Sequence, residues 1–475
     1  MRGPLSFLAP PAPAPPLPAA QGIKLFRLWR IRQISALFIG YAVFYFVRKN
    51  LPVAMPDLQR SMGIGTAQLG LFLTLHDLLY GVSKFGNGVI GDRSNPRILM
   101  AVGLFLSAVA NLCFGMTSGV VALGLWWLLN GWFQGMGFPP CARILSHWSA
   151  AHERGVIWGI WNASHQVGAA IIFVLAGYLV SHYGWRSGFV IPAIIAGSVS
   201  LFLAVRLRDT PQSLGLPSAE DFARHPLLTR TSSPQAQDHP GGPAQKKESE
   251  PRSDSRSEVR SQTSDEDFRA YLHRYVFGNA EIWLLCLANF FVYVIRYGVM
   301  NWAPMYLSNV RGQSMLHAST SVAGFEIAGL IGALAAGWLR DRVLAGRCAH
   351  LACAYMLATG AALLALWKLP LLGPRSPSDA TVLLLIGFCI YGPQFLVGIC
   401  AATLVGPRAV ATAIGLTGLF GYASSAVSGL GFGVLVARSG WDAPFICMVV
   451  GAAAAALCFV LLAPAEARAS TRTAE

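Results

Sequence analysis

The sequence is poor in charge and in cysteine motifs. Only 12% of its 475 residues are charged, whereas soluble domains carry about 25%. Its nine cysteines are scattered, mostly in apolar stretches, without a metal-site spacing such as CxxC, so we expect small buried side chains and no metal or cofactor. We find no convincing nucleotide loop or nucleophile elbow, which argues against an enzyme. The first 20 residues, rich in Pro and Ala, lack the layout of a cleaved signal peptide.

Apolar residues fill most of the chain instead. They make up 54% of it, and the mean hydropathy is +0.51. Stretches long enough to cross a bilayer, about 20 residues, recur along most of the sequence. This pattern predicts an all-α membrane protein in a lipid bilayer. We expect twelve spans, at residues 33–56, 66–90, 97–117, 120–146, 156–181, 186–206, 280–308, 317–339, 347–369, 379–405, 409–437 and 441–463.

A stretch of different composition separates the first six spans from the last six. Most of residues 209–275 is rich in Ser, Pro, Arg, Glu and Asp, a composition that buries too little apolar surface to form a core. We therefore expect a disordered linker there. The expected division is an N-terminal segment at 1–32, a six-helix half at 33–208, the linker, a second six-helix half at 276–464 and a tail at 465–475.

Basic residues gather in alternate loops. The formal net charge is +14, and Lys and Arg cluster before the first span, in the linker and in the tail. Cytoplasmic loops of membrane proteins carry an excess of Lys and Arg, so we expect both termini and the linker in the cytoplasm. Basic and aromatic residues do not interleave in an exposed domain, and we expect no nucleic-acid partner.

Several short motifs recur at nearly one offset. GVIGDR at 88–93 and GWLRDR at 337–342 lie 249 residues apart, and Arg48 and Arg296 lie 248 apart. GWRSGF at 184–189 and GWDAPF at 440–445 lie 256 apart. The halves are therefore predicted to be parallel repeats, related by an axis along the membrane normal. This is the arrangement of the major facilitator fold, with a substrate site between the halves near the midplane.

The repeated G-x-x-x-D-R loops lie at the cytoplasmic ends of the second and eighth spans. Glycine there permits a tight turn and close packing of helices. We expect these loops to hold neighbouring helices together rather than to bind substrate, through Asp92, Arg93, Asp341 and Arg342.

Charged side chains inside membrane spans usually face the interior of the bundle. Arg48 lies about fifteen residues, or roughly 22 Å, into the first span, and Arg296 lies at a similar depth in the seventh. The repeat therefore brings one arginine from each half to a comparable height. Snorkelling to an interface, or pairing with a structural carboxylate, is the alternative for Arg48.

Polar side chains accompany these arginines at helical spacing. Four stripes are predicted to line the cavity: Tyr41, Tyr45 and Arg48 in the first span, Asp77, Tyr80 and Lys84 in the second, Trp161, Asn162 and His165 in the fifth, and Tyr293, Arg296 and Tyr297 in the seventh.

This lining favours an anionic ligand. Guanidinium matches phosphate bidentately, and a phosphate group carries close to two negative charges near neutral pH, which two arginines would about neutralise. His165 is able to add a charge, since its protonation is adjustable near neutrality. The residues alone therefore predict transport of a small phosphorylated or otherwise anionic solute. Pairing of Lys84 with Asp77, and packing roles for His165 and the tyrosines, stay open.

Three more charged residues lie within the spans. Lys49 points about 100° away from Arg48 on a helix, and we expect it to be a structural partner or an interface residue. Glu326 is the lone carboxylate of the eighth span and lies 249 residues after Asp77, so it is the repeat mate of Asp77. These two carboxylates either tune the arginines, move with protons or hold helices together.

Long ordered motifs resemble one known family. FYFVRKNLPVAMPDL, YGVSKFGNGVIGDRSNPR, GWFQGMGFPPCARILSHWSAAHERG, WNASHQVG, FVYVIRYGV, FEIAGLIGALAAGW and GLTGLFGY are similar to segments of the organophosphate:inorganic phosphate antiporters, which include bacterial glycerol-3-phosphate and hexose-6-phosphate transporters. The resemblance runs from about residue 33 to 460.

The resemblance implies exchange of a phosphorylated metabolite for inorganic phosphate by rocking of two halves. It places the family's phosphate-binding arginines at Arg48 and Arg296. The other implied pore residues are Lys84, His165, Tyr41, Tyr45, Tyr80, Tyr391, Tyr422 and Glu326. It also implies a multi-pass protein of the cell membrane, or of an intracellular membrane in a eukaryote, and we expect a monomer.

The chain departs from the family pattern at two positions. Glycerol-3-phosphate carriers pair the lysine after the first arginine with an aspartate just before W-x-P in the seventh span, where this chain has Asn301. Asp77 places a carboxylate where those carriers have none.

RLRDTPQSLGLP at 206–217 resembles a subgroup that senses external hexose phosphate and signals to a membrane kinase, so a sensor with a kinase partner is the alternative function.

Overall fold

The computed structural model describes residues 9–224, 270–344, 347–368, 378–405 and 409–474. All regular elements among these residues are helical. The first half contains α1 (Ala19–Phe46), α2 (Leu51–Met62), α3 (Thr66–Arg93), α4 (Pro96–Met116), α5 (Val120–Gln134), α6 (Phe138–Trp148), α7 (Arg154–Tyr183) and α8 (Ser187–Arg206), followed by the short η2 (Pro211–Leu214) and α9 (Ala219–Arg224).

The second half repeats this organisation. Its elements are η3 (His273–Phe277), α12 (Ala280–Asn309), α13 (Met315–Arg342), α14 (Cys348–Lys368), α15 (Asp379–Val405), α16 (Val410–Ala423), η5 (Ala426–Gly431), α17 (Phe432–Ser439) and α18 (Asp442–Ala474).

Each predicted span corresponds to a helix or to a broken helix. The first span is divided into α1 and α2, the fourth into α5 and α6, and the eleventh into α16, η5 and α17. By length and composition alone, nine helices in the described part of the chain are able to cross a membrane. The broken spans account for part of the difference, because α2, α5 and α6 are too short to qualify by themselves.

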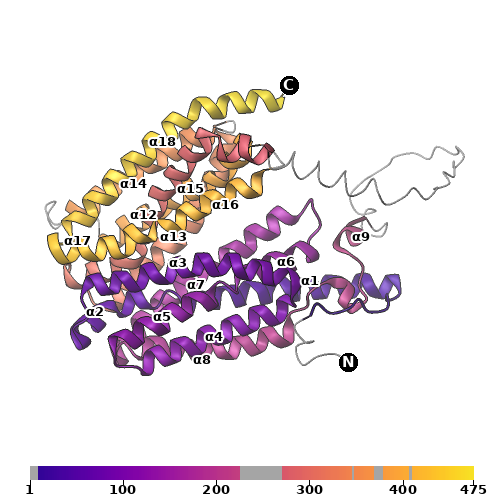
Figure 1. Cartoon of the computed structure of the whole chain (residues 1–475), viewed down its shortest axis with the longest axis horizontal. Helices are drawn as coiled ribbons and strands as arrows, with labels where there is room; N and C mark the ends of the chain where they lie inside the picture. Colours follow the sequence, from indigo (N-terminus) through magenta and orange to yellow (C-terminus); the bar gives the residue numbers. More distant parts are fainter. Residues whose placement is uncertain (1–8, 225–269, 345–346, 369–377, 406–408, 475) are drawn as a thin grey trace, which may run out of the picture.

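The two halves lie side by side and meet at one end of the bundle (Figure 1). This end carries α2 and α17, and both termini lie at the opposite end. The Thr66 hydroxyl donates to the Gly433 carbonyl at 2.9 Å, and the Thr74 hydroxyl donates to the Ser425 carbonyl at 2.8 Å. These bonds join α3 to the broken eleventh span and so close the bundle at the end away from the termini.

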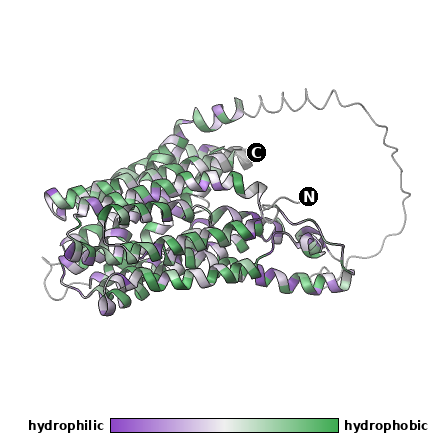
Figure 2. Cartoon of the chain, turned by 60° about the horizontal axis from the view of Figure 1, so that its bottom comes forward, coloured by the Kyte–Doolittle hydropathy of each residue, from purple (hydrophilic) through white to green (hydrophobic). Residues whose placement is uncertain are grey.

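Hydrophobic residues dominate the long helices of the bundle (Figure 2), and many large apolar side chains are exposed. Phe85, Val121 and Val205 are 81%, 78% and 74% exposed, an arrangement that is unfavourable in water and favourable against lipid tails. Hydrophilic residues gather at the helix ends and around α9. The chain is therefore a multi-pass membrane protein.

The start of the predicted linker is ordered, which corrects the expectation of disorder from residue 209. The amides of Ala14 and Leu17 donate to the carbonyls of Gln212 and Gly215, both at 2.9 Å. Phe222 of α9 stacks on Phe26 of α1 at a centroid distance of 4.3 Å. Aromatic stacking and backbone hydrogen bonds therefore hold residues 209–224 against α1 and the segment before it. Residues 225–269 of the linker lie outside the described part of the chain.

Candidate functional site

The first span breaks where its charged residues begin. α1 ends at Phe46 and α2 starts at Leu51, so Arg48, Lys49 and Asn50 lie in a short non-helical segment. The prediction that Arg48 continues a helical stripe from Tyr41 and Tyr45 is therefore wrong. Helical spacing alone does not reveal this break, although Asn50 as N-cap and Pro52 in the first turn of α2 were a visible signal that a helix starts there.

Buried amides from two other spans hold the broken segment. The Val47 carbonyl accepts hydrogen bonds from Asn111 Nδ2 at 2.8 Å and from Asn130 Nδ2 at 2.7 Å. Asn50 Nδ2 in turn donates to Asn111 Oδ1 at 2.7 Å. A carbonyl without a helical partner is costly inside a membrane, so these amides are what makes the break tolerable. The sequence reasoning missed them, although buried Asn residues in apolar spans were a visible signal.

Arg48 lies in an aromatic and acidic environment. Its guanidinium carbon is 3.8 Å from the centre of the Tyr80 ring and 5.5 Å from that of Tyr45. Its Nη2 lies 3.6 Å from Asp77 Oδ1, and the two side chains are 5% and 4% exposed. Arg48 Nε has no hydrogen-bond partner among the described residues, so a donor remains for a ligand.

Asp77 has a second neighbour that the sequence reasoning missed. His76 Nδ1 lies 3.2 Å from the same Oδ1 atom, and the His76 ring stacks on Trp127 at 4.9 Å. Pairing of Asp77 with Lys84, the alternative that the sequence left open, is not observed between these two described residues. Asp77 instead provides a counter-ion for Arg48, and His76 contacts the same carboxylate oxygen.

Arg296 lies within an unbroken helix and is surrounded by tyrosines. Its guanidinium carbon is 4.6 Å from the Tyr391 ring centre, 5.7 Å from Tyr293 and 5.6 Å from Tyr297. The Tyr391 hydroxyl donates to Glu326 Oε2 at 2.5 Å. Arg296 Nε and Glu326 Oε1 have no partner in the described part of the chain. The predicted seventh-span stripe therefore does gather around its arginine.

Lys49 is buried beside the seventh span. Its Nζ lies 5.2 Å from the centre of the Tyr297 ring, and it is within Coulombic range of Asp77. Asn301, at the position of the family's aspartate, is 1% exposed, and its Oδ1 has no partner among the described residues. The amide therefore does not neutralise Lys49 as an aspartate would.

Lys84 connects the arginine cluster to a cavity. Its Nζ donates to the Tyr422 hydroxyl at 3.3 Å and lies 3.9 Å from the Phe138 ring centre. The Tyr422 ring packs edge-on against Tyr80 at 5.4 Å. The cavity, of about 740 Å³, is lined by Lys84, Gly88, Phe138, Pro139, Ala142, Arg143, Ser146 and His147. It extends from the cluster along α3 and α6 toward the end of the bundle that carries the termini.

The predicted residues of the fifth span differ in burial. The His165 ring lies 5.7 Å from the Tyr45 ring, and its Nδ1 contacts the Asn162 carbonyl. Trp161 is fully buried and packs on Tyr41 at 4.9 Å, whereas the Asn162 side chain is exposed. Trp161 and His165 therefore lie beside the tyrosines of the first span, and a substrate-binding role for Asn162 stays a prediction.

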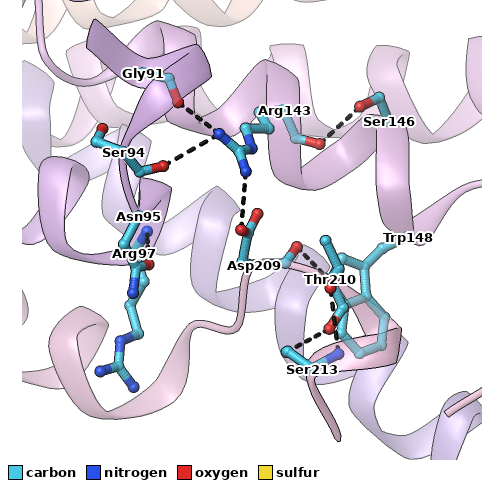
Figure 3. A network of polar contacts seen from close by, with 10 residues as sticks. All are labelled: Gly91, Ser94, Asn95, Arg97, Arg143, Ser146, Trp148, Asp209, Thr210 and Ser213. Atoms are coloured by element: carbon cyan, nitrogen blue, oxygen red, sulfur yellow. Dashed lines mark hydrogen bonds and ion pairs between the residues drawn. The ribbon is translucent and has the colours of Figure 1, made fainter. Parts of the chain in front are cut away.

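The loop at the end of α3 is held through its backbone (Figure 3). Arg143 Nη1 donates to the carbonyls of Gly91 and Ser94 at 2.8 and 3.1 Å, and its Nη2 donates to Asp209 Oδ2 at 3.0 Å. The side chains of Asp92 and Arg93 lie outside the described residues. The expected role of Asp92 and Arg93 therefore stays a prediction, and the contacts that link α3 to α6 and to Asp209 come from Arg143.

The corresponding loop of the second half differs. Asp341 is paired with its neighbour Arg340 at 2.9 Å and is 65% exposed, and Arg342 is exposed. Helix α14 is instead held by Glu466, whose two carboxylate oxygens accept from the amides of Cys348 and Ala349 at 2.8 Å. The expected helix-holding role of Asp341 and Arg342 therefore finds no support in their contacts.

One group in the described part of the chain has a metal-compatible spacing. The ligand atoms of Cys348, Cys400 and Glu466 lie within 4.8 Å of one another. Arg340 Nε lies 3.1 Å from Cys348 Sγ, so a guanidinium already occupies the place beside this thiol. A metal cation is disfavoured next to it, since like charges repel.

The charges of the central cluster favour a doubly negative ligand. Four cationic side chains, Arg48, Lys49, Lys84 and Arg296, face two carboxylates, Asp77 and Glu326, which leaves a formal excess of two positive charges. Tyrosine hydroxyls add neutral hydrogen-bond donors. Such a cluster suits an anion that accepts several hydrogen bonds.

Comparisons with known proteins place the chain in a family. At the sequence level it is similar to a "Probable hexose phosphate transport protein" of Chlamydia pneumoniae, with 39% identity over 92% of each chain. It is 36% identical to the "Glycerol-3-phosphate transporter" of Bacillus subtilis, over 95% of this chain and 96% of the other. It is 35% identical to the "Membrane sensor protein UhpC" of Escherichia coli, over 95% and 97%.

Solved structures with a similar fold are also membrane transporters. A bacterial homologue of the human lysosomal transporter Spinster, in an inward-facing and occupied conformation, superposes with a TM-score of 0.66 at 15% identity, over 92% of this chain and 96% of the other. A D-xylose–proton symporter gives 0.66 at 11% identity, over 92% and 97%. The profile of the Major Facilitator Superfamily matches residues 37–429. The chain therefore belongs to the Major Facilitator Superfamily.

Proposed function

We propose that the protein exchanges a small phosphorylated metabolite, a sugar phosphate or glycerol-3-phosphate, for inorganic phosphate. The observation that carries this proposal is the pair of buried arginines, one from each repeat, each with an Nε that has no hydrogen-bond partner among the described residues. Two guanidinium groups match the charge and the donor requirement of one phosphate dianion. Relatives named as hexose phosphate and glycerol-3-phosphate transporters support the same ligand class.

Alternating access explains how one site serves both sides of the membrane. The halves are joined at the end with α2 and α17, while the cavity along Lys84 lies toward the termini. We infer that the termini and the linker face the cytoplasm, so that this conformation faces inward. Rocking of the halves would then expose the arginines to the outside. The protein would act as a monomer in the cell membrane.

Charge balance supports exchange in place of net flux. An empty site keeps an excess of two positive charges in the middle of the membrane, which is unfavourable to occlude. A bound phosphate dianion removes that excess, and a ligand drives the transition only through its differential affinity for the two states. Arg48 is already paired with Asp77, so the unbalanced charge rests mainly on Arg296 and the lysines.

Counterflow in proteoliposomes tests the proposal. Vesicles loaded with inorganic phosphate should take up labelled phosphate, and a panel of glycerol-3-phosphate, glucose-6-phosphate and phosphoglycerate should compete for uptake. Arg48→Lys and Arg296→Lys lose the bidentate fork, and we expect each to abolish exchange. Arg60→Lys, at an exposed arginine of α2, serves as the control and should exchange normally. Full exchange by Arg48→Lys would contradict the proposed site.

A sensor of external hexose phosphate is the second candidate. The similarity to the membrane sensor protein UhpC extends over nearly the whole chain, and the ordered segment around η2 contains the sequence RLRDTPQSLGLP. A sensor would keep the arginine site and would regulate a histidine kinase. Saturable binding of glucose-6-phosphate without any counterflow would favour this role over transport.

A further inference from the structure

The carboxylate of Asp77 is an anion that the protein itself supplies to its binding site. Asp77 Oδ1 lies 3.6 Å from Arg48 Nη2, and the two side chains are almost fully buried. The Tyr80 ring covers one face of the guanidinium at 3.8 Å. Because water has little access to this pair, Arg48 depends on the carboxylate of Asp77 for compensation, whereas His76 and Lys49 also lie near that carboxylate.

This ion pair lies entirely within the first half. Arg48 precedes α2, and Asp77 belongs to α3. A movement of the two halves relative to each other therefore leaves the pair intact. Arg296 is different, because no carboxylate oxygen of the described residues lies within 4.0 Å of its guanidinium, and Glu326 is bonded to Tyr391 instead. An incoming anion thus meets competition at one arginine and not at the other.

We propose that Asp77 is a resident anion of the site, which occupies Arg48 while no substrate is bound and which a phosphate group must displace. This inference rests on the proposed function and identifies a residue that sets the affinity for phosphate. Asp77 lowers that affinity, since phosphate gains only the difference between its own pairing with Arg48 and that of Asp77. The pairing of Arg48 with Asp77 and the binding of phosphate are therefore coupled in free energy.

Binding of inorganic phosphate to the purified full-length protein in detergent tests this proposal. Asp77→Asn leaves Arg48 buried and unpaired in the empty protein, which destabilises it, and phosphate restores the pairing. By calorimetric titration we expect Asp77→Asn to bind phosphate at least about fivefold more tightly than the unmodified protein. Phosphate should also raise its melting temperature by more, because a ligand that binds only the folded state stabilises that state.

Asp57→Asn is the matched control. Asp57 of α2 pairs with the exposed Arg60 and not with a residue of the arginine cluster. Phosphate binding should therefore not change. A purely structural role for Asp77 predicts a lower melting temperature that phosphate does not restore. Unchanged or weaker phosphate binding by Asp77→Asn, with normal binding by the unmodified protein, would overturn the resident-anion proposal alone. If the unmodified protein binds neither inorganic phosphate nor an organophosphate, the proposed function itself is wrong.

His76 provides a second variant in case Asp77→Asn yields no folded protein. His76 and Arg48 share one oxygen of Asp77. His76→Leu removes the imidazole contact and leaves that oxygen to Arg48, so Asp77 competes more strongly and phosphate binding should weaken by about threefold. Equal or tighter binding by His76→Leu would contradict the proposal.

Discussion

Gly70 of α3 and Gly429 of η5 pack backbone against backbone. A Cβ atom on Gly70 would lie 2.4 Å from the Gly429 carbonyl oxygen, and one on Gly429 would lie 2.4 Å from Thr74 Oγ1. No side chain fits between the two halves at this point. The contact is therefore part of the closure at the end of the bundle away from the termini, and its small residues permit the close approach.

Gly70→Val should prevent this closure, because its side chain would collide with backbone atoms. We expect exchange to fall by at least about tenfold and the populations to shift toward the state that is open at this end. Spin labels at Gln59 and Asn309, whose side chains lie 3.4 Å apart, should report a longer distance. Gly86→Val on the same helix meets open space and is the control. An unchanged label distance in Gly70→Val would refute the argument.

Tyr391→Phe should weaken substrate binding through Glu326. The hydroxyl donates to Glu326 Oε2, and without it this buried carboxylate depends on the nearby cations, Arg296 first among them, to compensate its charge. Glu326 should then compete with phosphate for Arg296, and we expect an affinity loss of about tenfold. Tyr355→Phe removes a hydroxyl that has no partner among the described residues and should bind normally. Equal affinities for the two variants, measured by titration with phosphate, would argue against this role.

Asn111→Ala should loosen the broken first span. It removes the donor to the Val47 carbonyl and the acceptor for Asn50, and loss of buried partners costs about 1–3 kcal/mol per group. We expect a lower melting temperature together with weaker phosphate binding, because the segment contains Arg48. Asn87→Ala, whose amide bonds only to Ser83 of its own helix, should spare phosphate affinity. Normal affinity in Asn111→Ala would show that the amides do not position Arg48.

The pH dependence of stability should contain a contribution from Asp209, which lies beyond the last span of the first half. Burial raises the pKa of Asp209 above its ordinary value, although the neighbouring Arg143 and His147 act in the opposite direction. The folded protein therefore binds this proton more readily than the unfolded chain. The associated stability is fully present below the ordinary pKa of about 3.9 and is lost as pH rises through the folded pKa.

Asp209→Asn should flatten this slope, as measured by thermal unfolding in detergent from about pH 4 upward. Arg143→Ala removes the cation at 3.0 Å, so the pKa should rise further and the slope should extend to higher pH. Identical slopes in the unmodified protein and in Asp209→Asn would rule out this contribution.

The internal repeat was the basis of most of the predictions that the structure confirms. The offset between Arg48 and Arg296 placed one arginine in each half, and the twelve predicted spans match helices or broken helices. Tyr293 and Tyr297 beside Arg296 were predictable because α12 is an unbroken helix, where spacing maps directly onto a face.

The details around Arg48 were not predictable from spacing. The break at residues 47–50 depends on amides from α4 and α5 that meet the Val47 carbonyl only in the folded bundle. The same holds for His76, which becomes relevant only because Asp77 turns toward Arg48. Trp161 and Asn162 are neighbours in sequence, and packing against Tyr41 decided which of them is buried. Tertiary contacts thus determined what local periodicity left open.

The broken first span means that the two arginines are held by different kinds of hydrogen bond. Arg296 is fixed at one height by the helical hydrogen bonds of α12, whereas Arg48 belongs to a segment whose position depends on three asparagine side chains. Side-chain amides yield more readily than a continuous helix. One half of the protein therefore offers a rigid reference point, and the other offers an adjustable counterpart. If the proposed function holds, we expect phosphate esters of different size to be accommodated by shifts on the Arg48 side, with Arg296 remaining in place.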